Sequence, residues 1–371
     1  MKIYLVGGAI RDQLLGFPVK ERDWVVVGAS VNDMLKLGYR QVGKEFPVFL
    51  HPKTREEYAL ARIEHKTQPG YKGFEFDTSP EVSLKEDLER RDLTINAMAQ
   101  NVEGELIDPY QGQHDLAQKI LRHVSPAFAE DPVRILRVGR FLARYHHLGF
   151  KVAPETMQLM KNMVAAGEVN ALVAERVWKE LERALGEPNP EQFFNVLAEC
   201  GALAILFPQL ELNNAGIRAL TTATQISHHA AIRFAALLHD LPHAKPTITA
   251  LAQRYRLPNE YKELATLTAL HHAEALQAKQ LSAAELLQLF MTLDVFRREH
   301  RFKYFVLACQ AIATISPANQ FDATWLLDAA RIVKSIDVNA LIAAGYTNQA
   351  LAAKLKQERH EALEVWMEKN P

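Results

Sequence analysis

The spacing of apolar residues changes near residue 154, and the change predicts two kinds of structure along the chain. Before it, short β-branched and aliphatic runs such as residues 3–6 and 24–27 alternate with glycine turns and short helical stretches, which is typical of a small sheet carrying helices. After it, apolar residues recur every three or four positions almost to the end, which predicts helices. We therefore expect an α+β part followed by an all-α part.

The first predicted strand, residues 3–6, stops at Gly7 and Gly8, and a compact helical segment follows over residues 9–15. Glycines at such a turn let the backbone approach a ligand closely, and the free amides at a helix start favour anionic oxygens. Phosphate suits this turn, and Arg11, one helical turn further on, could add a charge-assisted contact. Taken alone, a Gly-Gly pair is more often an ordinary tight turn.

Two acids, Glu21 and Asp23, come directly before the strand predicted at residues 24–27. Because side chains alternate along a strand, both carboxylates are expected on one face, with Arg22 pointing away. Neighbouring carboxylates repel unless a cation lies between them, and a pair of this kind is what two magnesium ions about 3.5–4 Å apart require. A solvated charge cluster is the commoner reason for an isolated acid pair. Here the pair follows the glycine turn directly.

Four motifs occur in order, and together they resemble the class II tRNA nucleotidyltransferases, the CCA-adding enzymes. They are Gly7-Gly8-x-x-Arg11-Asp12 with Glu21-x-Asp23, Arg90-Arg91-Asp92-Leu93-Thr94-Ile95-Asn96-Ala97, Asp108-Pro109-Tyr110 through Arg122-His123-Val124, and Glu130-Asp131-x-x-Arg134. The chain departs from the family at Glu21, where the family usually has aspartate. Glutamate keeps the charge but adds a methylene, which leaves metal geometry and rate at this position open.

The resemblance implies a polymerase-β-like nucleotidyltransferase head, a small mixed sheet with helices, over residues 1–125. It implies a helical neck with the nucleotide-selecting motif over residues 126–187, and a helical body and tail that bind tRNA over residues 188–371. A loop rich in glycine and aromatic residues is expected over residues 69–74. A single helix is expected over residues 84–98.

The resemblance also implies roles for individual residues. Glu21 and Asp23 would hold Mg²⁺ and be catalytic, and Glu57, on a neighbouring strand, is a candidate third carboxylate. Asp92 would bond a ribose hydroxyl and Arg91 the phosphate side of the nucleotide, with Asn96 buttressing the motif. The full set expected to bind ATP or CTP is Gly8, Arg11, Arg91, Asp92, Asp131, Arg134, Arg137 and Arg140.

The helix predicted within residues 130–150 carries one apolar face and one strongly basic face formed by Arg134, Arg137, Arg140 and Arg144. Cytosine and adenine both offer an exocyclic amino donor beside a ring nitrogen that accepts, so a carboxylate and a guanidinium match both bases. Uracil and guanine present the reverse pattern. By resemblance, Asp131 and Arg134 are the pair that reads the base.

The implied reaction is attack of a tRNA 3′-hydroxyl on the α-phosphate of CTP or ATP, with pyrophosphate leaving, repeated to build C, C and A in tRNA maturation and repair. Helical surfaces suit recognition of the acceptor and T arms by shape. A bacterial poly(A) polymerase shares the head motifs and is the runner-up, although the near-neutral charge and the lack of a long basic tail argue against it. An RNA-binding protein whose catalysis has lapsed through Glu21 is a third reading.

A fourth reading, a phosphohydrolase, comes from residues 234–241, which resemble the His-Asp pair of metal phosphohydrolases carried by some bacterial members of the family. The rest of that motif is broken, because Pro242-His243-Ala244 stands where relatives have Gly-Lys-Gly and Arg218 where an upstream histidine is expected. His239 and Asp240 supply two ligands, whereas a metal site needs three or more. We expect a remnant domain kept for structure or RNA support.

Composition narrows the cellular setting and the kind of RNA-binding surface that the protein can have. The chain has 43 Lys and Arg against 44 acids and a net charge of −1, so any RNA surface must be a local basic patch. The cysteines, Cys200 and Cys309, are too few for a disulfide framework and fit a reducing cytosol. The opening apolar run is too short for a signal peptide, and no apolar run approaches a membrane span. We expect a cytoplasmic monomer or homodimer with no membrane contact.

Overall fold

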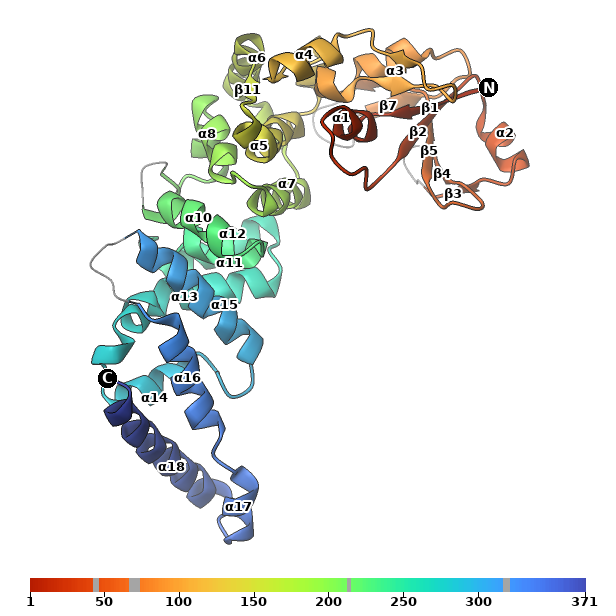
Figure 1. Cartoon of the computed structure of the whole chain (residues 1–371). Coiled ribbons are helices and arrows are strands. Elements are labelled where there is room, and N and C mark those ends of the chain that lie inside the picture. The colour runs from red at the N-terminus through yellow and green to blue at the C-terminus, as the bar shows by residue number, and fades with distance from the viewer. Residues whose placement is uncertain (43–46, 67–73, 212–214, 316–320) are drawn as a thin grey trace. The chain divides into compact units, whose positions relative to one another are not determined.

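The computed structural model describes residues 1–42, 47–66, 74–211, 215–315 and 321–371 (Figure 1). It divides the chain into two compact units, one formed by Met1–Ala184 with Gln192–Phe207 and the other by Leu185–Glu191 with Pro208–Pro371. The boundary expected at residue 125 falls inside the first unit, so the division into head, neck and body stays a prediction. The loop expected over residues 69–74 lies, except for Phe74, outside the described residues.

The first unit contains a seven-stranded mixed sheet with the strand order β3-β4-β5-β2-β1-β8-β9. Its strands are β1 (Lys2–Val6), β2 (Asp23–Val27), β3 (Arg40–Gln41), β4 (Val48–Leu50), β5 (Glu57–Leu60), β8 (Ala99–Gln100) and β9 (Leu106–Ile107). Strand β2 runs antiparallel to β1 and parallel to β5, with Asp23 opposite Val6 on one side and Glu57 on the other. The end of β1 and the starts of β2 and β5 therefore meet at one edge of the sheet.

Two further strand pairs complete the β structure of the described residues. Strands β6 (Ile63–Lys66) and β7 (Phe74–Asp77) are antiparallel, and β10 (Ile120–Leu121) and β11 (Lys151–Val152) are parallel. The early helices are α1 (Gly8–Leu14), α2 (Val31–Lys36), α3 (Leu84–Glu89), α4 (Gly112–Gln118), α5 (Val133–Tyr145), α6 (Pro154–Ala165), α7 (Ala174–Gly186), α8 (Glu191–Glu199) and α9 (Ala202–Leu206).

Among the described residues no strand follows β11, and from α10 onward every element is helical, which confirms the predicted change from mixed structure to helices (Figure 1). These helices are α10 (Ala215–Ile226), α11 (Ala230–Leu237), α12 (Ala244–Tyr255), α13 (Asn259–Leu276), α14 (Ala283–Thr292), α15 (Glu299–Thr314), α16 (Ala323–Lys334), α17 (Val338–Ala343) and α18 (Asn348–Lys369). Within the described parts of the chain, no helix combines the length and the apolar character needed to cross a membrane.

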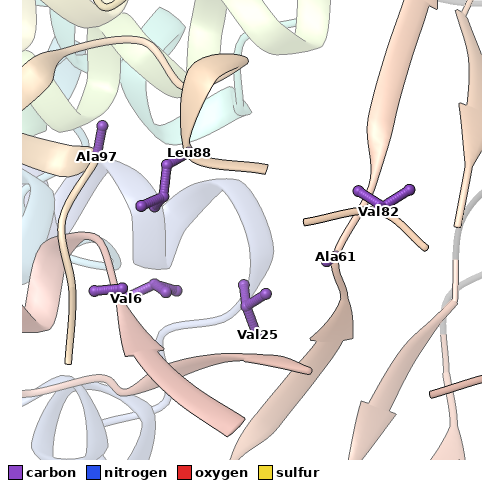
Figure 2. Packing of buried hydrophobic residues seen from close by; sticks show 7 residues of the cluster. Val6, Val25, Ala61, Val82, Leu88 and Ala97 are labelled. Atoms are coloured by element: carbon purple, nitrogen blue, oxygen red, sulfur yellow. The ribbon is translucent and has the colours of Figure 1, made fainter. Parts of the chain in front are cut away.

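A compact apolar cluster supports the edge of the sheet where the acids lie (Figure 2). Its buried members are Val6, Val25, Ala61, Val82, Leu88, Ala97 and Ala99. Val6 directly precedes the glycine turn, and Val25 lies two residues after Asp23 on the same face of β2. The same packing thus fixes the glycine turn, the start of β2 and helix α3.

The single helix expected over residues 84–98 is wrong. Helix α3 starts at a Ser83–Glu86 capping box and ends at Glu89, and the 3₁₀ turn η1 (Thr94–Asn96) follows. Leu93 forms a bridge with His123, and the Thr94 amide donates to the Arg122 carbonyl at 2.9 Å. This distant pairing uses backbone groups that a continued helix would need, so the helix cannot extend.

Replacing Leu88, which is fully buried in the cluster, by alanine should lower the free energy of unfolding of the first unit by about 2–5 kcal/mol, because a cavity is left. Val102→Ala is the control, since Val102 is 74% exposed and should change stability by less than about 0.5 kcal/mol. Urea denaturation monitored by circular dichroism measures both variants. Equal midpoints for the two would contradict this packing.

Candidate active site

The predicted acids lie together at the edge of the sheet. Asp23 begins β2, and Glu57, its partner in register, begins the parallel strand β5. Both line a cavity of about 480 Å³ to which Glu21 also contributes. The remaining lining residues are Val19, Lys20, Arg22, Thr54, Arg55 and Glu56.

The expected position of Arg22 is wrong. It lines the same cavity as the acids, and its Nη1 lies 3.8 Å from Glu56 Oε1. Strand β2 begins only at Asp23, so Glu21 and Arg22 belong to the preceding loop, where side chains do not alternate between faces.

The acids suit a hard divalent cation. Desolvation raises the pKa of Asp23, the charge of Arg91 opposes this rise, and the charge of Glu21 adds to it. A cation at this point would favour the ionised carboxylate and remove the repulsion. Among the described residues, no group of three or more His, Cys, Asp or Glu is placed to hold a metal alone. Substrate phosphates would have to complete the coordination, which is how Mg²⁺ is commonly bound.

The glycine turn brings a guanidinium close to these acids. Gly7 has φ +71, and a Cβ on it would lie 2.9 Å from Arg91 Nη1. Arg91 is held in turn by Asp87, with Nη2 donating to Oδ2 at 3.0 Å. Gly8, the next residue, is the first residue of α1. Arg91 therefore places a positive charge beside the predicted phosphate-binding turn.

Asp87 is completely buried and binds both Arg90 and Arg91, at 2.6 and 3.0 Å. Desolvation alone would raise the pKa of Asp87, but the two arginine charges outweigh it and lower the pKa to about 2. The carboxylate therefore stays ionised and fixes Arg91.

Arg11 lies inside the protein with 4% exposure. Its Nη1 donates to Asn96 Oδ1 at 2.5 Å, and its Nε donates to Asp12 Oδ1 at 2.9 Å. The guanidinium also lies over the Phe141 ring at 5.2 Å. Arg11 therefore connects α1 to the second motif, and its contact with a nucleotide stays a prediction.

Asn96 does buttress the second motif, as predicted. Its Nδ2 donates to Asp92 Oδ1 at 3.0 Å, while Arg137 Nε donates to Asp92 Oδ2 at 2.7 Å. Burial would raise the pKa of Asp92, but Arg137 and these hydrogen bonds hold it well below its usual range. Asp92 is thus an ionised carboxylate in the interior.

The basic face predicted on α5 is not simply solvated, because Arg134 and Arg140 are each only 7% exposed. Arg140 Nε donates to Glu180 Oε2 at 2.6 Å. Arg134 donates to the carbonyl oxygens of Ala127 and Arg90 at 2.9 and 2.6 Å. These arginines pack inside the first unit because acids and carbonyls on other segments meet them.

Arg176 and Glu180, both on α7, are functional candidates to which sequence reasoning gave no role. Arg176 donates to both oxygens of Asp131, at 3.0 and 2.7 Å, and Glu180 binds Arg140. The available signal was their spacing, since residues four apart share a helix face. Their partners are more than 30 positions away, so the sequence did not reveal the pairing.

Comparison with known proteins identifies the family of the chain. A family model described as the poly A polymerase head domain matches residues 3–122, and one described as a probable RNA and SrmB-binding site of polymerase A matches residues 149–213. The CCA-adding enzyme of Pseudomonas putida (strain W619) is 52% identical over 366 residues, which cover 99% of this chain and 98% of that protein. The chain belongs to the CCA-adding enzymes.

Two more proteins illustrate the range of the family. The multifunctional CCA protein of Pseudomonas putida (strain KT2440) is 53% identical over 368 residues, covering 99% of each protein. The solved Thermotoga maritima CCA-adding enzyme, complexed with tRNA_CCA, is 20% identical, with a TM-score of 0.71 over 98% of this chain and 87% of that one. At this identity the structural likeness shows the shared fold, including the polymerase-type head and helical remainder.

Of the predicted His-Asp pair, His239 is buried and Asp240 is exposed. His239 is 5% exposed, its Nδ1 lies 2.8 Å from the Ala236 carbonyl oxygen, and its ring lies 5.0 Å from the ring of His272. Desolvation lowers the pKa of His239. In the described parts of the second unit, these groups do not form a set of three metal ligands.

Gly7→Ala should destabilise the first unit more than Gly38→Ala. Both glycines have positive φ, but a Cβ at Gly38 meets nothing within 4 Å, whereas one at Gly7 meets Arg91. We expect a loss of about 1 kcal/mol for Gly38→Ala and about 2–3 kcal/mol for Gly7→Ala in urea denaturation. Equal losses would show that the Arg91 contact adds nothing.

The stability supplied by Asp87 should be lost in acid. Its folded pKa of about 2 lies below the unfolded value, so the contribution is complete above the unfolded pKa and disappears as pH falls through the folded pKa. The unfolding free energy of the wild type should fall by about 2 kcal/mol more than that of Asp87→Asn between pH 6 and pH 2. The exposed Glu81→Gln change should leave the wild-type pH dependence intact. Parallel curves for wild type and Asp87→Asn would refute the assignment.

Proposed function

We propose that this chain adds C, C and A in turn to the 3′ end of tRNA, taking CTP and ATP and releasing pyrophosphate without a nucleic-acid template. The main support is identity of about half with CCA-adding enzymes over nearly the whole chain. Asp23 also pairs in register with Val6, which precedes the glycine turn, and with Glu57 on β5. The carboxylates expected to bind metal therefore lie beside the turn expected to bind phosphate. Maturation and repair of tRNA would be its role, in the cytoplasm.

The ions would be Mg²⁺, bound by Glu21 and Asp23, while Glu57 lines the same cavity. The all-oxygen donor set of the cavity and the raised pKa of Asp23 support this choice. Such ions, when bound, favour ionisation of the attacking hydroxyl and neutralise the charge of the triphosphate.

The protein itself binds and orients the nucleotide. The Gly8 amide, at the start of α1, donates to the triphosphate, and Arg91, fixed by Asp87, adds a positive charge. Asp92 accepts a hydrogen bond from a ribose hydroxyl, because Arg137 and Asn96 keep it ionised and oriented. Arg11 supports this arrangement from within, through Asn96.

Base choice would fall to Asp131 and Arg134. Asp131 accepts from the exocyclic amino group of cytosine or adenine, and Arg134 donates to the neighbouring ring nitrogen. Support comes from the fact that both groups are oriented before a base arrives, Asp131 by Arg176 and Arg134 by two carbonyl oxygens. Arg137 and Arg140, bound to Asp92 and Glu180, keep positive charge beside the nucleotide.

The helices of the second unit would read the acceptor and T arms of tRNA through phosphates and 2′-hydroxyls. The helical character of this unit supports this mode of recognition. A phosphohydrolase activity at His239 and Asp240 is not part of the proposal.

Incubation of the protein with tRNA lacking CCA, Mg²⁺ and each nucleotide singly or together tests the function. CTP alone should add two residues, and ATP should add one residue only after CTP has been used. Continued tail growth with ATP alone would instead identify a poly(A) polymerase. No incorporation of CTP at any Mg²⁺ or Mn²⁺ concentration would indicate an RNA-binding protein without catalysis.

Asp23→Asn should lower kcat for CMP incorporation about a thousandfold or more while the protein stays folded, because the change removes the charge that holds the metal. Glu21→Asp, which restores the usual family residue, should stay within about tenfold of the wild type. Glu103→Gln, in an exposed turn, is the matched control. Retained activity in Asp23→Asn, measured by single-turnover kinetics, would remove Asp23 from the mechanism.

A further inference from the structure

The cavity at the acids carries positive charge on its β5 side. Arg55 lines this cavity together with Thr54, Glu56 and Glu57. Its side chain is exposed, and among the described residues the structure gives it no ion pair. A cation that lines an acidic cavity without a protein partner is available for an anionic ligand.

The backbone fixes Arg55 at this place. It has φ +63, a left-handed conformation that costs a non-glycine residue free energy. Its amide donates to the His51 carbonyl oxygen at 3.1 Å, and the His51 amide donates to the Glu56 carbonyl oxygen at 3.0 Å. The His51 ring lies 5.6 Å from the ring of Tyr58, a buried residue of the sheet. The turn is therefore tied to the core and presents Arg55 from a defined position.

The strand order indicates which substrate meets Arg55. Strand β1 and the glycine turn lie on one side of β2, and β5 lies on the other. In the proposed reaction the triphosphate binds at the glycine turn, on the β1 side of Asp23. In phosphoryl transfer the attacking and leaving oxygens lie roughly in line through the phosphorus. The RNA that carries the attacking hydroxyl must therefore approach Asp23 from the β5 side, where Arg55 lies.

We propose that Arg55 binds a backbone phosphate of the 3′-terminal strand of the acceptor RNA and so positions the attacking hydroxyl beside Asp23. The inference rests on the proposed function and names the part of the cavity that takes the RNA. Arg55 is a positioning residue, since it contacts a phosphate that does not react. It contributes to binding of the acceptor and not of the incoming nucleotide.

Steady-state kinetics with tRNA lacking CCA, and CTP, separate these contributions. Arg55→Ala should raise KM for tRNA about tenfold while kcat and KM for CTP stay within about twofold of the wild type. Lys53→Ala is the matched control, because Lys53 is exposed on the same turn but does not line the cavity. An increase in KM for CTP without one for tRNA would overturn the proposal.

Two more variants separate charge from backbone effects. Arg55→Gly removes the guanidinium and relieves the left-handed strain, so it should raise the thermal unfolding midpoint and still raise KM for tRNA. Arg55→Lys should restore part of the affinity. A normal KM for tRNA in the stable glycine variant would overturn the proposal.

Equilibrium binding of the same tRNA without nucleotide distinguishes this inference from the proposed function. Arg55→Ala should weaken binding relative to Lys53→Ala and lower the slope of log affinity against log salt by about one. If the wild type binds tRNA in this way but incorporates no CTP, only the transfer reaction fails. Equal tRNA affinities of the two variants would overturn the role of Arg55 whether or not transfer is observed.

Discussion

Neutralisation of buried arginines is the constraint on which the first unit depends. A charge taken out of water is costly unless it is paired and hydrogen-bonded, and Arg11, Arg134 and Arg140 are almost fully buried. Arg11 is paired with Asp12 on α1 and Arg140 with Glu180 on α7. Arg134 donates to two backbone carbonyl oxygens. The single carboxylate of Asp12 is contacted by Arg11, Arg144 and the Tyr145 hydroxyl. Removal of one acid would leave an uncompensated cation, so the motifs hold one another in place.

In the proposed function, this internal pairing would prepare the site for highly charged substrates. Groups already held by neighbours lose little freedom when a ligand binds, and they need not rearrange as charge develops. Asp87 fixes Arg91, and Arg176 fixes Asp131. At the edge of the sheet the situation differs, because Glu21, Asp23 and Glu57 line an open cavity, and an added cation would relieve the repulsion between Glu21 and Asp23.

Local patterns predicted the local parts of this molecule. The glycine turn, the start of β2 and the change to helices follow from periodicity and glycine placement, because short-range sterics decide them. The buried state of the α5 arginines did not follow, since it depends on Glu180, 40 positions from Arg140. The end of α3 was missed for the same reason, because the bridge from Leu93 to His123 competes with the helix. Alternation misplaced Arg22 because β2 begins only at Asp23, so Arg22 lies in the loop before the strand.

The long reach of these pairs bears on how the chain assembles during synthesis. Asp12 is bound by Tyr145 and Asp92 by Arg137, so residues 1–125 alone would lack these partners. Arg140 in turn is bound by Glu180, which is synthesised still later. The nascent polypeptide would hold its catalytic half incomplete on the ribosome until α7 has emerged from the exit tunnel. Helix α7 would therefore complete the internal pairing of the first unit only late in synthesis.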